Sequence, residues 1–360
     1  MSKPKIYVSR VLRPNVLARL GEVGEIRNWE KPGRCPAEVL EKEVADVDAV
    51  LGTDRWTAEL MDKATRLRII ALTAVGFDSV DVAAATERGI IVTNTAGSLT
   101  DTVADLVFAL MLGAARRVCE SERWLRAGQW KTLGVTPMGW DVHHATLGIL
   151  GLGRIGAAVA DRARGLQMKV LYYDTVRRED LEQQYGYQFV DLDTLLKESD
   201  FITLHTALSP ETKGLIGESA LAKMKPTAFL INTSRGPVVD EAALIKALQE
   251  KRIAGAGLDV FEKEPIDLEN PLLKMENVVT LPHVGSATEA TRQAMVDLAA
   301  DNILAVLQGK PPLTPVNPEV LRDRVDGSGV HVLRNRQPSG NTSPGDGPLG
   351  TNRRSNSYGR

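Results

Sequence analysis

Short runs of aliphatic and β-branched residues alternate with amphipathic helical stretches along most of this chain. Before residue 95, the runs that predict strands are 6–8, 25–27, 49–51, 69–73 and 90–92. Later in the chain, strands are predicted at 147–150, 169–173, 201–204, 228–232, 254–259 and 278–281, with helices near 178–184, 192–198, 217–223 and 241–249 between them. This alternation is typical of parallel sheets that are covered by helices. We therefore expect an α/β protein with two such sheets.

Two longer stretches have the pattern of long helices. Residues 100–128 predict one helix, whose uncharged centre at 106–115 is too short to cross a bilayer and is therefore expected to be buried. That centre is more apolar than packing on one sheet requires, so either a subunit interface or an interdomain position would explain it. Residues 289–307 predict a final helix that packs back on the first sheet.

The order of these elements predicts a domain inserted within another domain. A Rossmann-type, doubly wound nucleotide domain at 99–287 would interrupt a flavodoxin-like α/β substrate domain at 1–98 and 288–318. A cleft between two domains that are joined by two crossings, near Gly97 and Ala287, permits hinge closure. The segment 319–360 is rich in Gly, Pro, Ser and Asn and is predicted to be a disordered tail.

Composition narrows the class of protein without changing this picture. A net charge of −2 over 360 residues gives no field that would attract nucleic acid or an anionic membrane. Cys35 and Cys119 lie far apart, and neither they nor the histidines have a metal-binding spacing, so we expect no metal site and a reducing, cytoplasmic location. The N-terminus also becomes charged too soon for a secretory signal.

A dinucleotide fingerprint stands between the strand at 147–150 and the helix that follows it. Gly151 permits a tight turn, Gly153 lets the backbone approach a pyrophosphate, and Gly156 lets the helix pack closely on the strand. The start of that helix would face the phosphates with unpaired N–H groups. Asp174 ends the next strand, 18 residues beyond Gly156, where a carboxylate can accept hydrogen bonds from a ribose. The spacing predicts a bound dinucleotide.

Three later strand ends carry groups suited to the reduction of a 2-keto acid. Arg235 can bind a carboxylate or keto oxygen, His283 can donate a proton, and Glu264 can fix the tautomer of that histidine. Each has an ordinary alternative: a surface ion pair for Arg235, a solvated loop position for Glu264 and a structural role for His283. In the first sheet, the turn Ala74, Val75 and Gly76 either holds a small anion through its N–H groups or is a plain strand-to-helix connection.

Four motifs in this order, GLGRIG, NTSRGPVVDE, GLDVFEKEP and PHVGSAT, resemble the D-isomer-specific 2-hydroxyacid dehydrogenases. The likeness covers roughly residues 3 to 318 and is strongest to their glyoxylate and hydroxypyruvate reductase branch. The resemblance implies that Arg235, Glu264 and His283 form a catalytic triad, and that Ala74, Val75 and Gly76 bind the substrate carboxylate together with Arg235 and His283. It also implies a homodimer through the nucleotide domain.

The same resemblance assigns the cofactor site. It implies that Leu152, Gly153, Arg154 and Ile155 cradle the pyrophosphate and that Thr102 reaches a phosphate. The residues that it places around the ribose and nicotinamide are His205, Thr233, Ser234, Arg235, Asp259, His283 and Gly285. Of these, Asp259 would hold the carboxamide. Relatives that prefer NADP commonly have a Ser-Arg pair where this chain has Asp174 and Thr175, with Arg177 and Arg178 further on. Because a carboxylate there repels a 2′-phosphate, we expect NAD(H) to be preferred over NADP(H).

The expected function is therefore NADH-dependent reduction of glyoxylate or hydroxypyruvate to glycolate or D-glycerate. The alternatives are a dehydrogenase of another D-2-hydroxy acid, such as 2-ketogluconate or phosphoglycerate, and an NAD-sensing protein similar to a corepressor. Neither a nucleic-acid nor a membrane partner is expected. Side-chain size in the cleft would select the substrate, and Leu51, Thr53 and Trp140 are candidates for that role.

Overall fold

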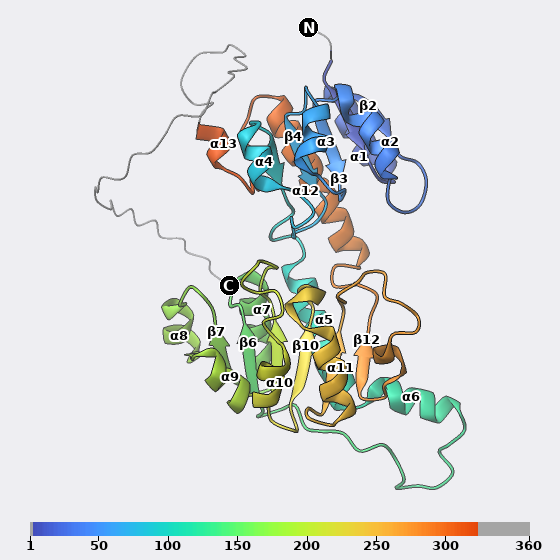
Figure 1. The fold of residues 1–360 in the computed structure, drawn as a ribbon, viewed down its shortest axis with the longest axis vertical. Coiled ribbons are helices and arrows are strands. Elements are labelled where there is room, and N and C mark those ends of the chain that lie inside the picture. The colour runs from blue at the N-terminus through green and yellow to red at the C-terminus, as the bar shows by residue number, and fades with distance from the viewer. Residues whose placement is uncertain (1–2, 323–360) are drawn as a thin grey trace, which may run out of the picture.

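The computed structural model describes residues 3–322, which form two lobes, each built on one sheet (Figure 1). The first sheet has the order β2-β1-β3-β4-β5, and all its neighbouring strands are parallel. Its strands are β1 (Lys5–Val8), β2 (Glu25–Asn28), β3 (Ala49–Gly52), β4 (Ile69–Leu72) and β5 (Ile91–Thr93). Its connecting helices are α1 (Pro14–Val23), α2 (Ala37–Glu43), α3 (Ala58–Lys63) and α4 (Val82–Glu87).

The second sheet has seven parallel strands in the order β12-β11-β10-β9-β6-β7-β8. The strands are β6 (Thr146–Leu150), β7 (Lys169–Tyr173), β8 (Gln188–Phe189), β9 (Phe201–Leu204), β10 (Phe229–Asn232), β11 (Gly255–Leu258) and β12 (Val278–Thr280). The helices between them are α7 (Arg154–Gly165), α8 (Glu179–Tyr185), α9 (Leu192–Glu198), α10 (Glu218–Lys223) and α11 (Glu241–Gln249). Strand order reverses beside β6, as in a doubly wound sheet, so the topological switch point lies at the end of this strand.

The predicted α/β fold with an inserted Rossmann-type domain is confirmed. The final helix α12 (Glu289–Leu307) follows the second sheet in sequence but packs on β3 and β4 of the first. Its Ala299, Ala300 and Ile303 are buried with Ile69 and Ala71 in one apolar cluster. The chain thus crosses between the lobes twice, before α5 and after β12. The predicted domain limits at residues 98 and 288 stay predictions.

One predicted element is wrong: residues 100–128 form two helices, α5 (Thr100–Ala115) and α6 (Val118–Arg126). Arg117 between them has a left-handed backbone conformation, with φ of 53°. The carbonyl of Ala115, at the end of α5, accepts a hydrogen bond from the N–H of Trp140 at 2.9 Å. A segment more than twenty residues downstream therefore takes the carbonyl that the next turn of a continued helix would use. The short edge strand β8 was not predicted either.

The predicted tail is wrong at its start, because Glu319–Arg322 form the helix α13. Val320 on this helix is buried in the same apolar cluster as α12. The rest of the predicted tail lies outside the described residues. Among residues 3–322, no helix is both long and apolar enough to cross a membrane.

Candidate active site

The glycine turn after β6 leaves room and hydrogen-bond donors for a phosphate group. Gly151 has a φ of 92°, and a Cβ atom at Gly156 would lie 2.1 Å from the carbonyl oxygen of Gly151. A Cβ atom at Gly153 would meet nothing within 4 Å. No acceptor within residues 3–322 pairs with the N–H groups of Gly153, Arg154 and Ile155 at the start of α7. Unpaired donors at a helix N-terminus bind anions, so these residues fit a pyrophosphate.

Asp174 stands at the end of β7 and supports this turn. Its Oδ2 accepts a hydrogen bond from the N–H of Leu152 at 2.6 Å, and its Oδ1 accepts one from the N–H of Val176 at 3.2 Å. The two arginines beyond it are held by carboxylates. Arg177 forms two hydrogen bonds with Glu182, at 2.9 and 2.7 Å, and Arg178 forms two with Asp180, also at 2.9 and 2.7 Å. Both guanidinium groups beyond the end of β7 are therefore already paired with carboxylates.

Buried hydroxyl groups mark the next strand ends. Among the described side chains, the hydroxyls of Thr206 and Thr233 are buried without a hydrogen-bond partner, which is costly unless a ligand supplies one. Ser234 is held by the side chain of Asn232, to which its N–H and hydroxyl donate at 3.0 and 2.9 Å. These orphaned groups at the carboxyl ends of β9 and β10 fit a bound cofactor.

His205 and Thr102 have partners within the chain. Nε2 of His205 lies 2.9 Å from the hydroxyl of Thr203, and burial lowers the pKa of His205 to about 3, so the ring is neutral at physiological pH. The hydroxyl of Thr102, at the start of α5, lies 2.6 Å from that of Thr291 on α12. This contact joins the two helices at which the chain crosses between lobes, whereas the resemblance implied a phosphate contact for Thr102.

The structure brings His283 and Glu264 together. Nδ1 of His283 donates to Oε2 of Glu264 at 2.7 Å, because an ionised carboxylate can only accept. Oε1 of Glu264 accepts a hydrogen bond from the N–H of Phe261 at 3.1 Å. Burial alone would raise the pKa of Glu264, but the hydrogen bond and charge of His283 outweigh it and lower that pKa. The tautomer is thereby fixed, and Nε2 of His283, which has no hydrogen-bond partner among residues 3–322, is the ring nitrogen that can meet a substrate.

Asp259 holds the loop that carries this histidine. Its carboxylate is buried at the end of β11 and accepts hydrogen bonds from the N–H groups of Val284, at 2.7 Å, and Gly285, at 2.8 Å. His283 itself has a φ of 53°, which non-glycine residues seldom adopt. Burial raises the pKa of Asp259, and these two hydrogen bonds counteract that effect. In this structure Asp259 thus shapes the loop, while the carboxamide contact implied by the resemblance stays a prediction.

Arg235 reaches from the second lobe to the first. Its Nε donates to Oδ1 of Asp78 at 2.9 Å, and its Nη1 donates to the carbonyl of Ser234 at 2.8 Å. Nη2 lies so close to Gly76 that a Cβ atom there would be 1.5 Å from it. Only glycine can occupy this position while the guanidinium lies where it does.

The turn that Arg235 touches presents unpaired donors. The carbonyls of Ala74 and Val75 accept hydrogen bonds from the N–H of Thr95, at 2.9 Å, and the side chain of Asn94, at 2.8 Å. In the part of the chain that the structure describes, the N–H groups of Val75 and Gly76 have no acceptor. The turn is therefore fixed through its carbonyls and offers N–H groups beside a guanidinium, an arrangement that can bind a carboxylate.

Sequence patterns missed some supporting residues and misjudged two others. Asp78 and Asn94 were not predicted, because their partners are identified only by the fold. Leu51 is fully buried in the core of the first lobe and cannot contact a substrate. Trp140 packs edge-on against Phe229, with ring centroids 5.3 Å apart. Since Phe229 begins β10, this contact lies at the end of the sheet opposite to the candidate site, and Trp140 does not line the cleft of its own chain.

Residues 108–285 match the family model described as D-isomer specific 2-hydroxyacid dehydrogenase, NAD binding domain. Over 329 residues the chain is 49% identical to a protein named glyoxylate reductase from Korarchaeum cryptofilum, covering 90% of this chain and 99% of that protein. The chain belongs to the D-isomer-specific 2-hydroxyacid dehydrogenase family. The resemblance found in the sequence motifs, including the likeness to glyoxylate reductases, is confirmed.

Solved structures of family members share the fold. One is an NADPH-dependent glyoxylate/hydroxypyruvate reductase from Sinorhizobium meliloti in complex with NADP and malonate, with a TM-score of 0.80 and 39% identity, covering 88% of this chain and 97% of that one. Another is a glyoxylate reductase from Paecilomyes thermophila, with a TM-score of 0.81 and 33% identity, covering 89% of this chain and all of the other. The protein is thus an oxidoreductase of this dehydrogenase family with a Rossmann domain for a nicotinamide cofactor.

The two hydrogen bonds to Asp259 lead to a prediction about stability. Asp259→Asn replaces one acceptor oxygen by an NH₂ group, which would face a backbone N–H and leave it unpaired. A buried unpaired donor costs about 1–3 kcal/mol, so thermal unfolding should show a midpoint lower by several degrees. Asp267→Asn is the matched control, because Asp267 also accepts from a backbone N–H but is exposed. Equal midpoints for the two variants would show that Asp259 does not hold the loop.

Proposed function

We propose that this dehydrogenase reduces glyoxylate and hydroxypyruvate to glycolate and D-glycerate, with NADH as the cofactor and His283 as the proton donor. The observation that carries the proposal is the convergence of two sets of groups at the strand ends. The second lobe supplies the His283–Glu264 pair and Arg235, and the first supplies the unpaired N–H groups of Val75 and Gly76 against which Arg235 lies. Relatives named as glyoxylate reductases over nearly their whole length support the choice of substrate.

The turn and Arg235 bind and orient the acid in this proposal. The carboxylate of the substrate accepts hydrogen bonds from the N–H groups of Val75 and Gly76, whose positions are set by Asn94 and Thr95. The Nη2 group of Arg235 lies on the same turn and polarises the keto oxygen. Because these groups belong to different lobes, closure of the cleft would bring them onto the substrate and exclude water.

His283 supplies the proton. A bound dihydronicotinamide would supply the hydride that is transferred to the keto carbon. The residues that would hold this cofactor are Gly153 to Ile155, Thr206 and Thr233. As the keto oxygen gains negative charge, Nε2 of a protonated His283 donates its proton to it and leaves a hydroxyl group. Glu264 stays ionised at neutral pH, since its pKa is lowered, and it stabilises the charged imidazole before the transfer.

NADH is the cofactor that the surroundings of Asp174 favour. The carboxylate stands where the ribose of a dinucleotide binds in this fold and would repel a 2′-phosphate. Arg177 and Arg178 could otherwise attract that phosphate, but each is held by two hydrogen bonds to its own carboxylate. The Sinorhizobium meliloti relative is NADPH-dependent, so the choice of NADH for this chain rests on the surroundings of Asp174 and not on that relative.

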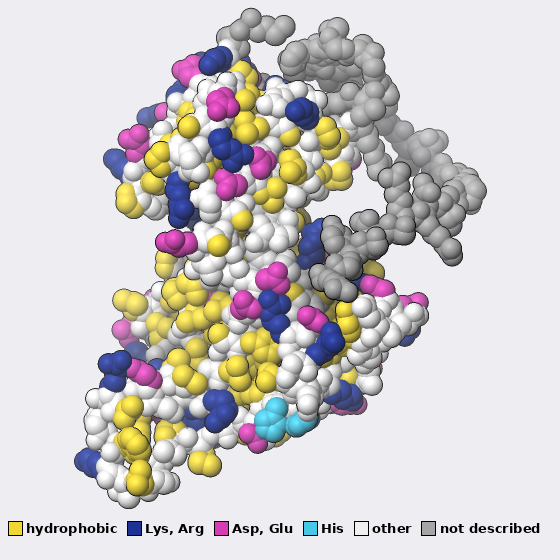
Figure 2. All heavy atoms as spheres, turned by 180° about the vertical axis from the view of Figure 1, so that it is seen from behind, with side chains coloured by type: hydrophobic (Ala, Val, Ile, Leu, Met, Phe, Trp, Pro, Cys, Tyr) yellow, Lys and Arg dark blue, Asp and Glu magenta, His cyan; other side chains and the backbone are white. Residues whose placement is uncertain are grey.

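A homodimer through the second lobe accounts for the exposed apolar residues around α5 and α6. On the face shown in Figure 2, hydrophobic side chains gather over this lobe and over the segment that projects from it. The exposed large apolar residues of this region are Leu112, Val118, Leu125, Trp130, Leu133, Val135, Met138 and Trp140. So many exposed apolar side chains in one region are typical of an interaction surface.

His283→Gln should abolish most turnover of glyoxylate with NADH. General acid catalysis contributes about 10²–10⁴-fold, so kcat should fall by that order while the dissociation constant of NADH, measured by fluorescence, stays nearly unchanged. His143→Gln, at an exposed histidine outside the site, is the control and should retain activity. Full activity of the His283 variant would refute the proposed role.

Asp174→Ser should raise the ratio of kcat/KM with NADPH to kcat/KM with NADH. Removing a like charge from the 2′-phosphate is expected to change this ratio by about tenfold or more. Asp141→Ser removes the same charge at an exposed position outside the cofactor site and should leave the ratio as it is. If both variants show the ratio of the unmodified protein, Asp174 does not determine the preference for NADH over NADPH.

The dimer predicts a concentration-dependent mass in solution. Light scattering after size-exclusion chromatography should give twice the mass of 39.1 kDa at micromolar concentration. Leu133→Glu, at a side chain that is 84% exposed in the single chain, should shift the protein toward the monomer by placing a charge in the interface. Leu313→Glu, at a 57% exposed apolar residue of the first lobe, is the matched control. A monomeric unmodified protein would contradict the proposal.

A further inference from the structure

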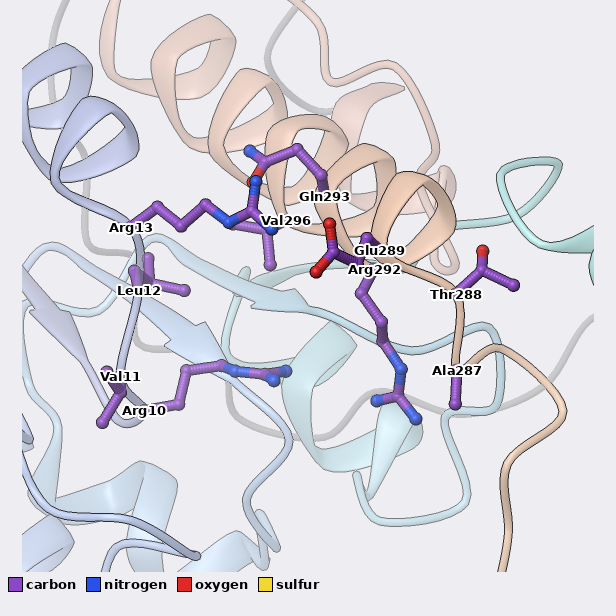
Figure 3. Close-up of a pocket in the computed structure, with 10 residues that line it drawn as sticks. All are labelled: Arg10, Val11, Leu12, Arg13, Ala287, Thr288, Glu289, Arg292, Gln293 and Val296. Carbon is purple, nitrogen blue, oxygen red and sulfur yellow. The ribbon is translucent and has the colours of Figure 1, made fainter.

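A polar pocket lies on the first lobe, beside the crossing by which the chain returns to it after β12 (Figure 3). It has a volume of about 430 Å³. One wall is the segment 10–13, which follows β1, and the other is the loop at 287–288 with the first turns of α12. Nothing in the proposed reduction of glyoxylate uses this space.

The pocket is lined by more positively charged than negatively charged side chains. Among the described residues, Arg10, Arg13 and Arg292 line it together with one carboxylate, that of Glu289. Within residues 3–322, the side chains of Arg13 and Arg292 form neither an ion pair nor a hydrogen bond. Arg19 makes a useful contrast, because it also faces α12 but is paired with Asp297 and Asp301. Arg13 and Arg292 are therefore available to a ligand.

Two of these arginines face one another across the pocket. Arg10 and Arg292 extend toward each other from the two walls in Figure 3. Burial lowers the pKa of Arg10, and the charge of Arg292 lowers it further. Like charges repel, and an anion bound between the two guanidinium groups would relieve that repulsion while gaining charge-assisted hydrogen bonds from both. The N-terminal end of the 19-residue helix α12 adds a partial positive charge on the same side.

The pocket adjoins both loops of the candidate active site. Arg10 donates a hydrogen bond through Nη1 to the hydroxyl of Thr73, the residue that precedes the turn Ala74 to Gly76. On the other wall, Ala287 lies four residues after His283 and follows the loop that Asp259 holds. An anion in the pocket would thus touch the supports of both the carboxylate-binding turn and the proton donor.

We propose that Arg10, Arg13 and Arg292 form a second anion-binding site on the first lobe, beside the crossing after β12, which takes an oxyanion such as a phosphate or carboxylate group. The anion has two possible sources: a free oxyanion from solution, or the distal anionic group of a 2-keto acid longer than glyoxylate. Both sources present the same chemistry to the arginines, and two measurements distinguish them.

The first measurement is calorimetric titration of the NADH-saturated protein with inorganic phosphate, in the absence of substrate. Saturation with NADH keeps phosphate from the start of α7. Arg292→Gln and Arg13→Gln should each weaken phosphate binding. For Arg292→Gln the dissociation constant of phosphate should rise by about tenfold or more, because a charge-assisted contact is lost. Arg252→Gln, at an exposed arginine outside the pocket, should bind phosphate as the unmodified protein does. Unchanged NADH binding and unfolding temperature show that each variant is folded.

The second measurement compares two substrates of equal chain length, 2-oxobutanedioate and 2-oxobutanoate. Because it requires turnover of 2-keto acids, only this measurement rests on the proposed function. If the distal group of the substrate is the ligand, the ratio of their kcat/KM values should fall by about tenfold or more in Arg292→Gln and stay unchanged in Arg252→Gln. An unchanged ratio together with phosphate binding that depends on Arg292 identifies a free oxyanion as the ligand.

Two results would overturn the inference. One is that neither phosphate binding nor the substrate ratio distinguishes Arg292→Gln from Arg252→Gln. The other is that phosphate binding is lost in Arg235→Gln but kept in Arg292→Gln, which places the anion on the substrate turn. Failure of the unmodified protein to reduce glyoxylate would count against the proposed function and leave the phosphate titration valid.

Discussion

The buried carboxylate of Asp259 is the constraint on which the candidate chemistry depends. It ties the end of β11 to the loop after β12 through two backbone hydrogen bonds, and the loop then holds His283 in a left-handed conformation. This conformation directs the ring to Glu264, which fixes its tautomer. A carboxylate in an apolar core is costly unless its oxygens are paired, so the loop and the carboxylate stabilise each other. The position of His283, the proposed proton donor, is thus set by the core of the sheet.

The second requirement is that groups from both lobes meet. The carboxyl ends of the parallel strands in each sheet face the junction, and a connection through the two crossings before α5 and after β12 permits hinge motion. Arg235 links the lobes by its ion pair with Asp78, which is 45% exposed at its side chain. An exposed ion pair contributes little to stability, so this link guides the position of the guanidinium without locking the lobes together. Hinge motion and a preformed anion site are therefore compatible.

The sequence predicts those features that depend on local pattern. Alternating apolar runs predicted most of the strands, and the spacing of Gly151, Gly153 and Gly156 predicted the turn after β6. Features that depend on distant contacts were missed. The break after Ala115 is set by Trp140, and the partner of Arg235 lies 157 positions away in the sequence. Trp140 could be named as a cleft candidate but not positioned, because the fold alone places it at the opposite end of β10.

The hydrogen bonds of Arg235 are compatible with the proposed binding of a substrate carboxylate, although this arginine is already paired. Asp78 and the carbonyl of Ser234 engage Nε and Nη1, and they fix the plane of the guanidinium. Nη2 is then directed at Gly76, beside the two N–H groups that have no acceptor among the described residues. A free arginine would lose rotamer entropy on binding a carboxylate, whereas this one has lost it on folding. Asp78 reduces the net positive charge of the site but fixes the orientation of the guanidinium group. A small substrate such as glyoxylate has few atoms that the protein can hold, so correct orientation of the binding groups matters most for it.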